Sequence, residues 1–136
     1  MSVVRHAALL LLLPSAVWAQ AGALEECRRG AEAPAQLLQC LQLAQRTASD
    51  DMLAQFQAVE QRLRQRGSEE ARAAGPAALR RAQRAFEGYI EAQCGFMHDL
   101  AGGGPLGTAA ALACETDLLR QRGTMLRGLL PVRPQN

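Results

Sequence analysis

Any chemistry in this chain of 136 residues would rest on four cysteines and, outside the first twenty residues, one histidine: Cys27, Cys40, Cys94, Cys114 and His98. Thiolate and imidazole groups are ligands that copper and zinc prefer. Cys94 and His98 lie four residues apart, so on a helix they would share one face, beside Met97. The chain has no C-x-x-C pair, however, and dithiol redox centres depend on that motif to lower a thiol pKa. A metal carrier that uses Cys94 and His98 is therefore a remote alternative to disulfide bonds.

Other catalytic arrangements are missing from the sequence. A hydrolase triad would have to join His98 to Ser49 or Ser68, which the helical pattern places at the opposite end of the protein. The glycines at residues 102–104 lack the Lys and Ser/Thr that complete a phosphate-binding loop. We therefore predict that the chain is not an enzyme and that it holds neither a metal nor another cofactor.

The first twenty residues have the features of a secretory signal peptide. Arg5 precedes an apolar run over residues 7–13, and Ala19 stands where a signal peptidase needs a small residue. We expect cleavage after Ala19, with Ala21 or Ala23 as alternative positions. The apolar run is too short to span a bilayer. The sequence thus predicts a periplasmic or secreted protein with no stable membrane insertion once the signal is removed.

Export would affect the oxidation state of the cysteines and the net charge of the mature chain. An even number of cysteines in a small exported protein favours disulfides, here two, and spacing alone leaves all three pairings open. All 15 basic residues are Arg, and removal of Arg5 leaves 14 against 13 acidic residues. This near-neutral balance argues against nucleic acid or an anionic membrane as the main partner.

Three segments carry apolar residues at steps of three and four, which is typical of amphipathic α-helices. They run over residues 34–66, 75–102 and 108–129. Pro34 suits the first position of a helix, because its missing N–H would be unpaired there in any case. Gly75-Pro76 marks the start of the second helix, after a short helical turn that begins at Ser68. Thr108 is a suitable N-cap for the third helix.

No segment shows the alternation of a β-strand, so we predict an all-α fold. We expect an antiparallel three-helix bundle over residues 34–130, between an N-terminal arm over residues 20–33 and a flexible tail over residues 131–136. At about 1.5 Å per residue, all four cysteines fall at one end of this bundle, where two disulfides would staple it. Four aromatic residues are expected to supply much of the bulk of the core: Phe56, Phe86, Tyr89 and Phe96.

Two polar residues fall within the apolar stripes of these helices. Arg122 lies in the stripe of the third helix, and a buried guanidinium without a partner is costly. We therefore expect an internal partner for it, either Asp51 or Glu91, and the alternative is that Arg122 anchors a carboxylate of a binding partner. Gln83, in the stripe of the second helix, is expected to be hydrogen-bonded within the bundle.

The spacing of residues along the second and third helices resembles that of a known family. The pattern is Leu79-x3-Gln83-Arg84-Ala85-Phe86-x2-Tyr89-x4-Cys94, then paired glycines, Cys114 and Arg122-x3-Leu126. With the spacing of Cys27 and Cys40, it resembles the lysozyme inhibitor LprI N-terminal domain family over residues 27–130. The chain departs from the family pattern at Phe86, where the family usually has Trp, and at Ile90, where an Arg commonly follows the aromatic residue.

The resemblance implies a helical, disulfide-bonded periplasmic protein that acts by contact with a lysozyme or another envelope protein. Because loops carry recognition more often than scaffold faces do, we expect the contact at the turn from Gly95 to Gly107. The candidate partner-binding residues in this turn are Phe96, His98, Asp99, Gly102, Gly103 and Gly104. A structural envelope protein without affinity for lysozyme is the alternative from another functional class.

Overall fold

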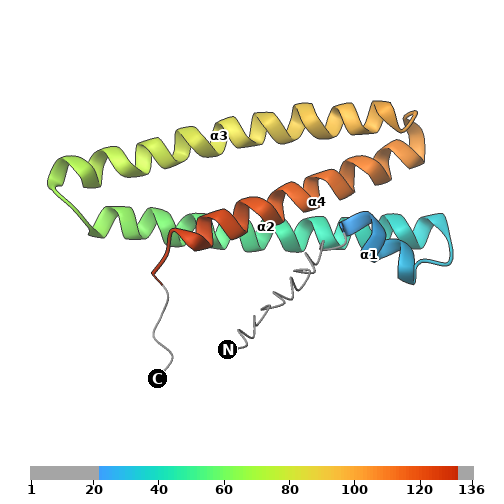
Figure 1. Ribbon diagram of the computed structural model, residues 1–136, viewed down its shortest axis with the longest axis horizontal. Helices are drawn as coiled ribbons and strands as arrows, with labels where there is room; N and C mark the ends of the chain where they lie inside the picture. Colours follow the sequence, from blue (N-terminus) through green and yellow to red (C-terminus); the bar gives the residue numbers. More distant parts are fainter. Residues whose placement is uncertain (1–21, 132–136) are drawn as a thin grey trace, which may run out of the picture.

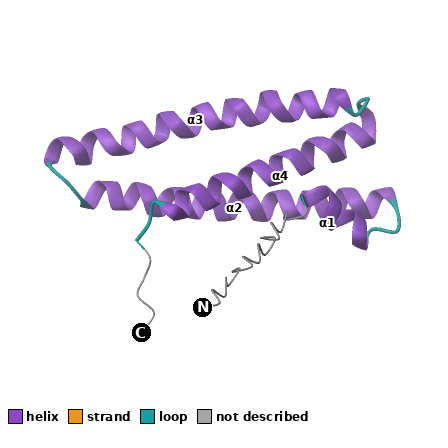
Figure 2. Cartoon of the chain, in the orientation of Figure 1, coloured by secondary structure: helices purple, strands orange, loops and turns teal. Residues whose placement is uncertain are grey.

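The computed structural model describes residues 22–131, which form four α-helices joined by short loops. The helices are α1 (Ala23–Gly30), α2 (Pro34–Gln65), α3 (Glu69–Leu100) and α4 (Gly104–Gly128). Figure 1 shows three long helices lying along one another, with the chain reversing direction at both turns, and the short α1 packed at one end. Figure 2 shows that the described range contains only helices and loops. The prediction of an all-α fold is confirmed, whereas the predicted number of three helices is wrong.

Two predicted segments lie outside the described residues. These are the signal peptide over residues 1–19, with its cleavage site after Ala19, and all but the first residue of the tail over residues 131–136. Between residues 22 and 131, no helix combines the length and the apolar character needed to cross a membrane.

The additional helix is α1, in the segment that was expected to be an arm without regular structure. It has only eight residues, and so short a helix is not stable by itself in water. It is held from outside: the backbone N–H of Ala23 donates to Oδ1 of Asp117 on α4 at 2.9 Å, and both Ala23 and Cys27 are buried. A segment of this length cannot show a helical period clearly, which is why the sequence pattern missed it.

The first long helix begins at Pro34, as predicted. The side chain of Gln36 reaches back over this end, where Oε1 accepts from the backbone N–H of Glu32 at 2.7 Å and of Ala33 at 3.2 Å. The buried face of α2 follows the predicted stripe and comprises Leu41, Ala48, Met52 and Val59.

The second long helix begins earlier than predicted. Ser68 caps it by accepting a hydrogen bond from the N–H of Ala71 at 3.2 Å, and α3 then continues without a break through Gly75-Pro76. The predicted boundary at these residues is therefore wrong. Pro76 deprives the carbonyl of Arg72 of its helical donor, but strong helix formers flank it on both sides and Gly75 packs against Leu63 of α2.

The last helix also begins earlier than predicted, at Gly104. Gly103 is the N-cap and Pro105 occupies the first turn, where a residue without an N–H is well tolerated. Thr108 is not the N-cap: its hydroxyl donates to the carbonyl of Gly104 at 3.0 Å from within the helix.

The buried residues form two clusters along the length of the protein. One lies where α1 packs on α2 and α4, and comprises Ala23, Cys27, Leu41, Ala109 and Ala113. The other lies between the three long helices, and comprises Ala48, Met52, Val59, Leu119 and Leu126. Phe56 and Phe86 pack against the second cluster, but Tyr89 and Phe96 are 52% and 57% exposed. The prediction that all four aromatic residues fill the core is thus wrong for two of them.

Candidate functional site

The four cysteines form two disulfides, and no free cysteine remains among the described residues. Cys27 pairs with Cys40 and joins α1 to α2, whereas Cys94 pairs with Cys114 and joins α3 to α4. The structure therefore chooses one of the three pairings that spacing left open. It also overturns the metal-carrier alternative, because the sulfur of Cys94 is bonded to another sulfur and is not available as a thiolate ligand.

The turn between α3 and α4 is shaped by three successive glycines. Gly102, Gly103 and Gly104 have φ angles of 85°, 70° and 57°, in the left-handed region that side chains with a Cβ rarely adopt. The N–H of Gly102 donates to the carbonyl of Asp99 at 2.9 Å, and the N–H of Gly103 donates to that of His98 at 3.0 Å. These bonds satisfy the last carbonyls of α3 and close the helix with a fixed geometry.

His98 connects the two helices on the inner side of this turn. A Cβ built on Gly107 would lie 2.7 Å from the carbonyl oxygen of His98 and 2.8 Å from Cδ2 of its ring, so only glycine allows α4 to pass this close. Nδ1 of His98 lies 3.1 Å from Oδ1 of Asp99, whose side chain is 85% exposed. The disulfide between Cys94 and Cys114 links the same two helices, about two to three helical turns away from the glycines.

The turn also carries large apolar side chains on its outside. Phe96, Leu100 and Leu106 are 57%, 66% and 69% exposed. The structure therefore brings the predicted residues Phe96, His98 and Asp99 together with the three glycines at one end of the protein. Leu100 and Leu106 were not among the predicted residues. The spacing of Leu100 matched the buried face of α3, and Leu106 follows Pro105 in a segment that was expected to be loop.

Arg122 does not pair with either of the acidic residues that were predicted as its partner. Its Nε donates to Oε1 of Gln83 at 3.3 Å, and its guanidinium lies 5.4 Å from the centre of the Phe86 ring. The amide nitrogen of Gln83 in turn lies 3.2 Å from Oε1 of Glu87 and 3.6 Å from Sδ of Met52. Gln83 is only 7% exposed, so this chain of contacts links α2, α3 and α4 inside the bundle.

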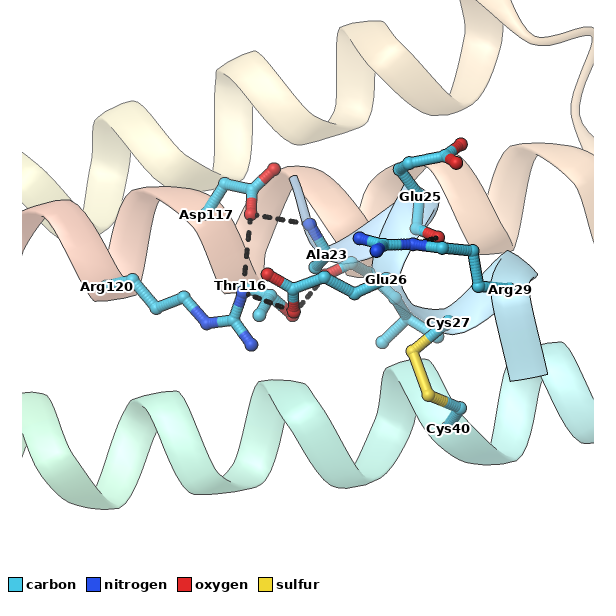
Figure 3. A network of polar contacts seen from close by, with 10 residues as sticks. Ala23, Glu25, Glu26, Cys27, Arg29, Cys40, Thr116, Asp117 and Arg120 are labelled. Carbon is cyan, nitrogen blue, oxygen red and sulfur yellow. Dashed lines mark hydrogen bonds and ion pairs between the residues drawn. A yellow bond between two sulfur atoms is a disulfide. The ribbon is translucent and has the colours of Figure 1, made fainter. Parts of the chain in front are cut away.

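A second polar network holds α1 against α4 (Figure 3). Asp117 accepts from the N–H of Ala23, and Nη1 of Arg120 lies 2.9 Å from Oε2 of Glu26 and 4.0 Å from Oδ1 of Asp117. These residues border an open groove of about 940 Å³. The charged groups of Glu26, Asp117 and Arg120 are already engaged in contacts that fix α1. We therefore interpret this network as the support of α1 and not as a ligand site.

A smaller opening of about 220 Å³ lies between α2 and α3. Its floor is apolar, with Met52 and Phe56, and its rim carries Arg80. Nη2 of Arg80 is paired with Oε1 of Glu60 at 2.6 Å. Within the described residues, no group of three or more His, Cys, Asp or Glu side chains is placed to hold a metal ion.

Comparison with known proteins identifies the family. No curated protein and no solved structure matched this chain. The family described as lysozyme inhibitor LprI matches residues 27–126, which are 100 of the 136 residues. The match begins at Cys27, in the disulfide that anchors α1, and ends at Leu126, which is fully buried in the second cluster. The chain therefore belongs to the lysozyme inhibitor LprI family.

Proposed function

We propose that this chain is an exported inhibitor of lysozyme that acts without catalysis, by binding the enzyme through the turn between α3 and α4. Membership of the lysozyme inhibitor LprI family supports the activity. Two disulfides support export to the periplasm or beyond the cell, because disulfides persist in oxidising compartments. The observation that carries the choice of surface is the combination of a rigid turn and exposed leucines at one end of the bundle.

Rigidity matters because an inhibitor that is ordered before it binds loses less conformational entropy on binding. The turn is held by the disulfide between Cys94 and Cys114, by the hydrogen bonds of Gly102 and Gly103, and by the close packing of Gly107 on His98. Leu100 and Leu106 stand on either side of it and are mostly exposed. A fixed projection with an apolar rim is well suited to fill the cleft of an enzyme.

The chemistry of a muramidase cleft favours the same end of the protein. Glycoside hydrolases of this kind use a pair of carboxyl groups on either side of the scissile bond. The first turn of α4, at Gly104 and Leu106, has backbone N–H groups without helical acceptors and lies at the positive end of the helix dipole. We expect this helix end to face the carboxylates, while the leucines cover the walls of the cleft.

The test is to titrate the purified oxidised protein into a c-type and a g-type lysozyme and to follow lysis of cell walls. We expect saturable inhibition of at least one enzyme. The variant Leu106→Asp should weaken inhibition at least tenfold, because it places a carboxylate beside those of the enzyme. Leu129→Asp is the matched control, since Leu129 is 58% exposed at the opposite end of α4 and should inhibit like the wild type.

Each result decides a different part of the proposal. No inhibition of either enzyme at high micromolar excess would overturn it and favour a structural envelope protein without affinity for lysozyme. Inhibition that Leu106→Asp leaves unchanged would retain the activity but show that another surface makes the contact.

A further inference from the structure

One face of α3 is apolar along nearly its whole length, and no other helix among residues 22–131 packs on it. Its residues follow one another at steps of three and four, which places them on one side of the helix, and every one is exposed. We call this face the α3 stripe; it comprises Ala71, Ala74, Ala78, Ala82, Ala85, Tyr89, Ala92, Phe96 and Leu100. Figure 1 shows α3 as an outer helix of the bundle.

The side chains of the α3 stripe are small in its first part and include large ones in its second part. Up to Ala85 it contains only alanine, and after that point it carries Tyr89, Phe96 and Leu100. These three side chains are 52%, 57% and 66% exposed, so the bundle leaves much of their apolar surface in water. Spacing of this kind is that of helices which pack along each other, and none of the helices α1, α2 and α4 covers these side chains.

Two glycines beside the stripe also indicate that another helix packs on this face. A Cβ built on Gly88 or on Gly95 would meet nothing within 4 Å, so no contact in the described part of the chain accounts for either glycine. A glycine inside an exposed helix costs about 1 kcal/mol relative to alanine. A gain on association would offset this cost, because a glycine lets a second helix come close to the backbone.

We propose that two copies of this chain associate through the α3 stripe, with their α3 helices antiparallel around a two-fold axis near residue 87. In this register Tyr89 lies against the partner's Ala85 and Phe96 lies against the partner's Ala78. The two-fold axis makes every contact occur twice. Large side chains then meet small ones in each of these layers, which is the condition for dense packing. A parallel pair would set aromatic rings against each other and leave alanine facing alanine with gaps between them.

The charges on α3 also favour antiparallel association of the two copies. Residues 69–86 contain four arginines and two glutamates, a net charge of +2, from Glu69, Glu70, Arg72, Arg80, Arg81 and Arg84. Residues 87–100 contain three acids and no arginine, a net charge of −3 with His98 neutral, from Glu87, Glu91 and Asp99. Of these residues, Arg81 and Asp99 are exposed and flank the stripe on the same side, whereas Arg80 is already paired with Glu60 of α2. Antiparallel association places Arg81 of each copy about 9 Å along the helices from the partner's Asp99, and this opposite-charge proximity favours that direction.

The size of the stripe sets the expected affinity. From Ala74 to Leu100 it is about 39 Å long at 1.5 Å per residue, and a helix is about 10 Å wide. The contact would therefore cover several hundred Å² on each copy, at the low end of specific interfaces, so we expect a micromolar dissociation constant. Phe96 and Leu100 also border the turn proposed to bind lysozyme, so a second copy and a lysozyme would compete for these side chains. The inference does not depend on that activity.

The first test is the molar mass of the purified oxidised protein by light scattering, at a concentration of about 100 µM, above the expected dissociation constant. We expect the mass of two chains. Ala85→Arg should reduce it to one chain at the same concentration, because the guanidinium would replace the alanine opposite the partner's Tyr89. Ala73→Arg is the matched control on the opposite side of α3 and should leave the mass of two chains.

The second test distinguishes the direction of the helices. Gly88→Cys places a thiol close to the two-fold axis, so a short bifunctional maleimide should link two copies. Ala78→Cys should not be linked, because its two copies would lie about 27 Å apart along the helices. A single-chain mass for the wild type, or a two-chain mass for Ala85→Arg, would overturn the proposal. Cross-linking at Ala78→Cys, with or without cross-linking at Gly88→Cys, would overturn the antiparallel register, because a parallel pair places each residue beside its own copy.

Discussion

The two ends of this protein are stabilised in different ways. The end that contains α1 and the turn between α3 and α4 holds both disulfides. Its buried residues are three alanines, Cys27 and Leu41, with four partly buried leucines packed against them. The opposite end has Met52, Leu119 and Leu126 in its core, with Phe56 and Phe86 beside them, and no cross-link. The buried residues of this first cluster are smaller than those of the second, so they bury less apolar area. Covalent bonds thus supplement packing at the end whose buried residues are smaller.

The largest effect should follow from removing both disulfides, by reduction or by replacing the four cysteines with serine. The bonds span 13 and 20 residues, and each is worth about 3 kcal/mol by chain entropy. A loss of about 6 kcal/mol is comparable to the whole stability of many small domains. We expect urea unfolding to show a protein that is largely unfolded or only marginally folded. An unchanged urea midpoint after complete reduction would contradict this comparison of the two ends.

Leu126→Ala tests the end that depends on packing. Leu126 is fully buried, and truncation of such a leucine costs about 3–4 kcal/mol through lost transfer energy and a cavity. Leu129→Ala, three residues further on and 58% exposed, is the control and should change the free energy of unfolding by less than about 0.5 kcal/mol. Equal effects of the two variants in chemical unfolding would show that this core does not carry the stability assigned to it.

Gly107→Ala examines the close packing at the cross-linked end. The added methyl group would lie 2.7 Å from the backbone oxygen of His98, so α4 must shift, at an expected cost of about 2 kcal/mol. Gly95→Ala, where the methyl group meets nothing within 4 Å, should instead stabilise the single chain by about 1 kcal/mol at concentrations well below those of the proposed association. Thermal unfolding measures both, and a neutral Gly107→Ala would mean that the turn is looser than its geometry indicates.

Asp117→Ala should have the smallest effect and lower the free energy of unfolding by about 1 kcal/mol. It removes the acceptor for the N–H of Ala23, and the partly exposed contact with Arg120 adds little. We expect faster amide hydrogen exchange confined to α1, since the disulfide of Cys27 still tethers that helix. Asp50→Ala, at an exposed position on α2, is the control. Loss of protection throughout the bundle would show that Asp117 has a wider role.

Much of the fold could be predicted because helices are encoded locally. The start of α2 at Pro34, its buried stripe and the stop of α3 before the glycines all follow from residues within one or two turns. The wrong boundary at Gly75-Pro76 came from a strong local break signal. The helix α3 nevertheless continues through these residues, because packing on Leu63 of α2 and good helix formers on both sides compensate for the lost hydrogen bond. The candidate site was predicted in outline, but which of its leucines face water depends on how the helices are rotated.

The sequence by itself determined the helical class, the oxidised cysteines, the glycine turn and the resemblance to the family, since each depends on residue type and short-range spacing. Only the tertiary structure decided the pairing of the cysteines, the folding of α1 and the partner of Arg122. These depend on contacts between residues far apart in the chain, such as Ala23 with Asp117, 94 residues away, and Arg122 with Gln83, 39 residues away. Helical periodicity shows which side of a helix is apolar, and packing decides which residue of another helix it meets.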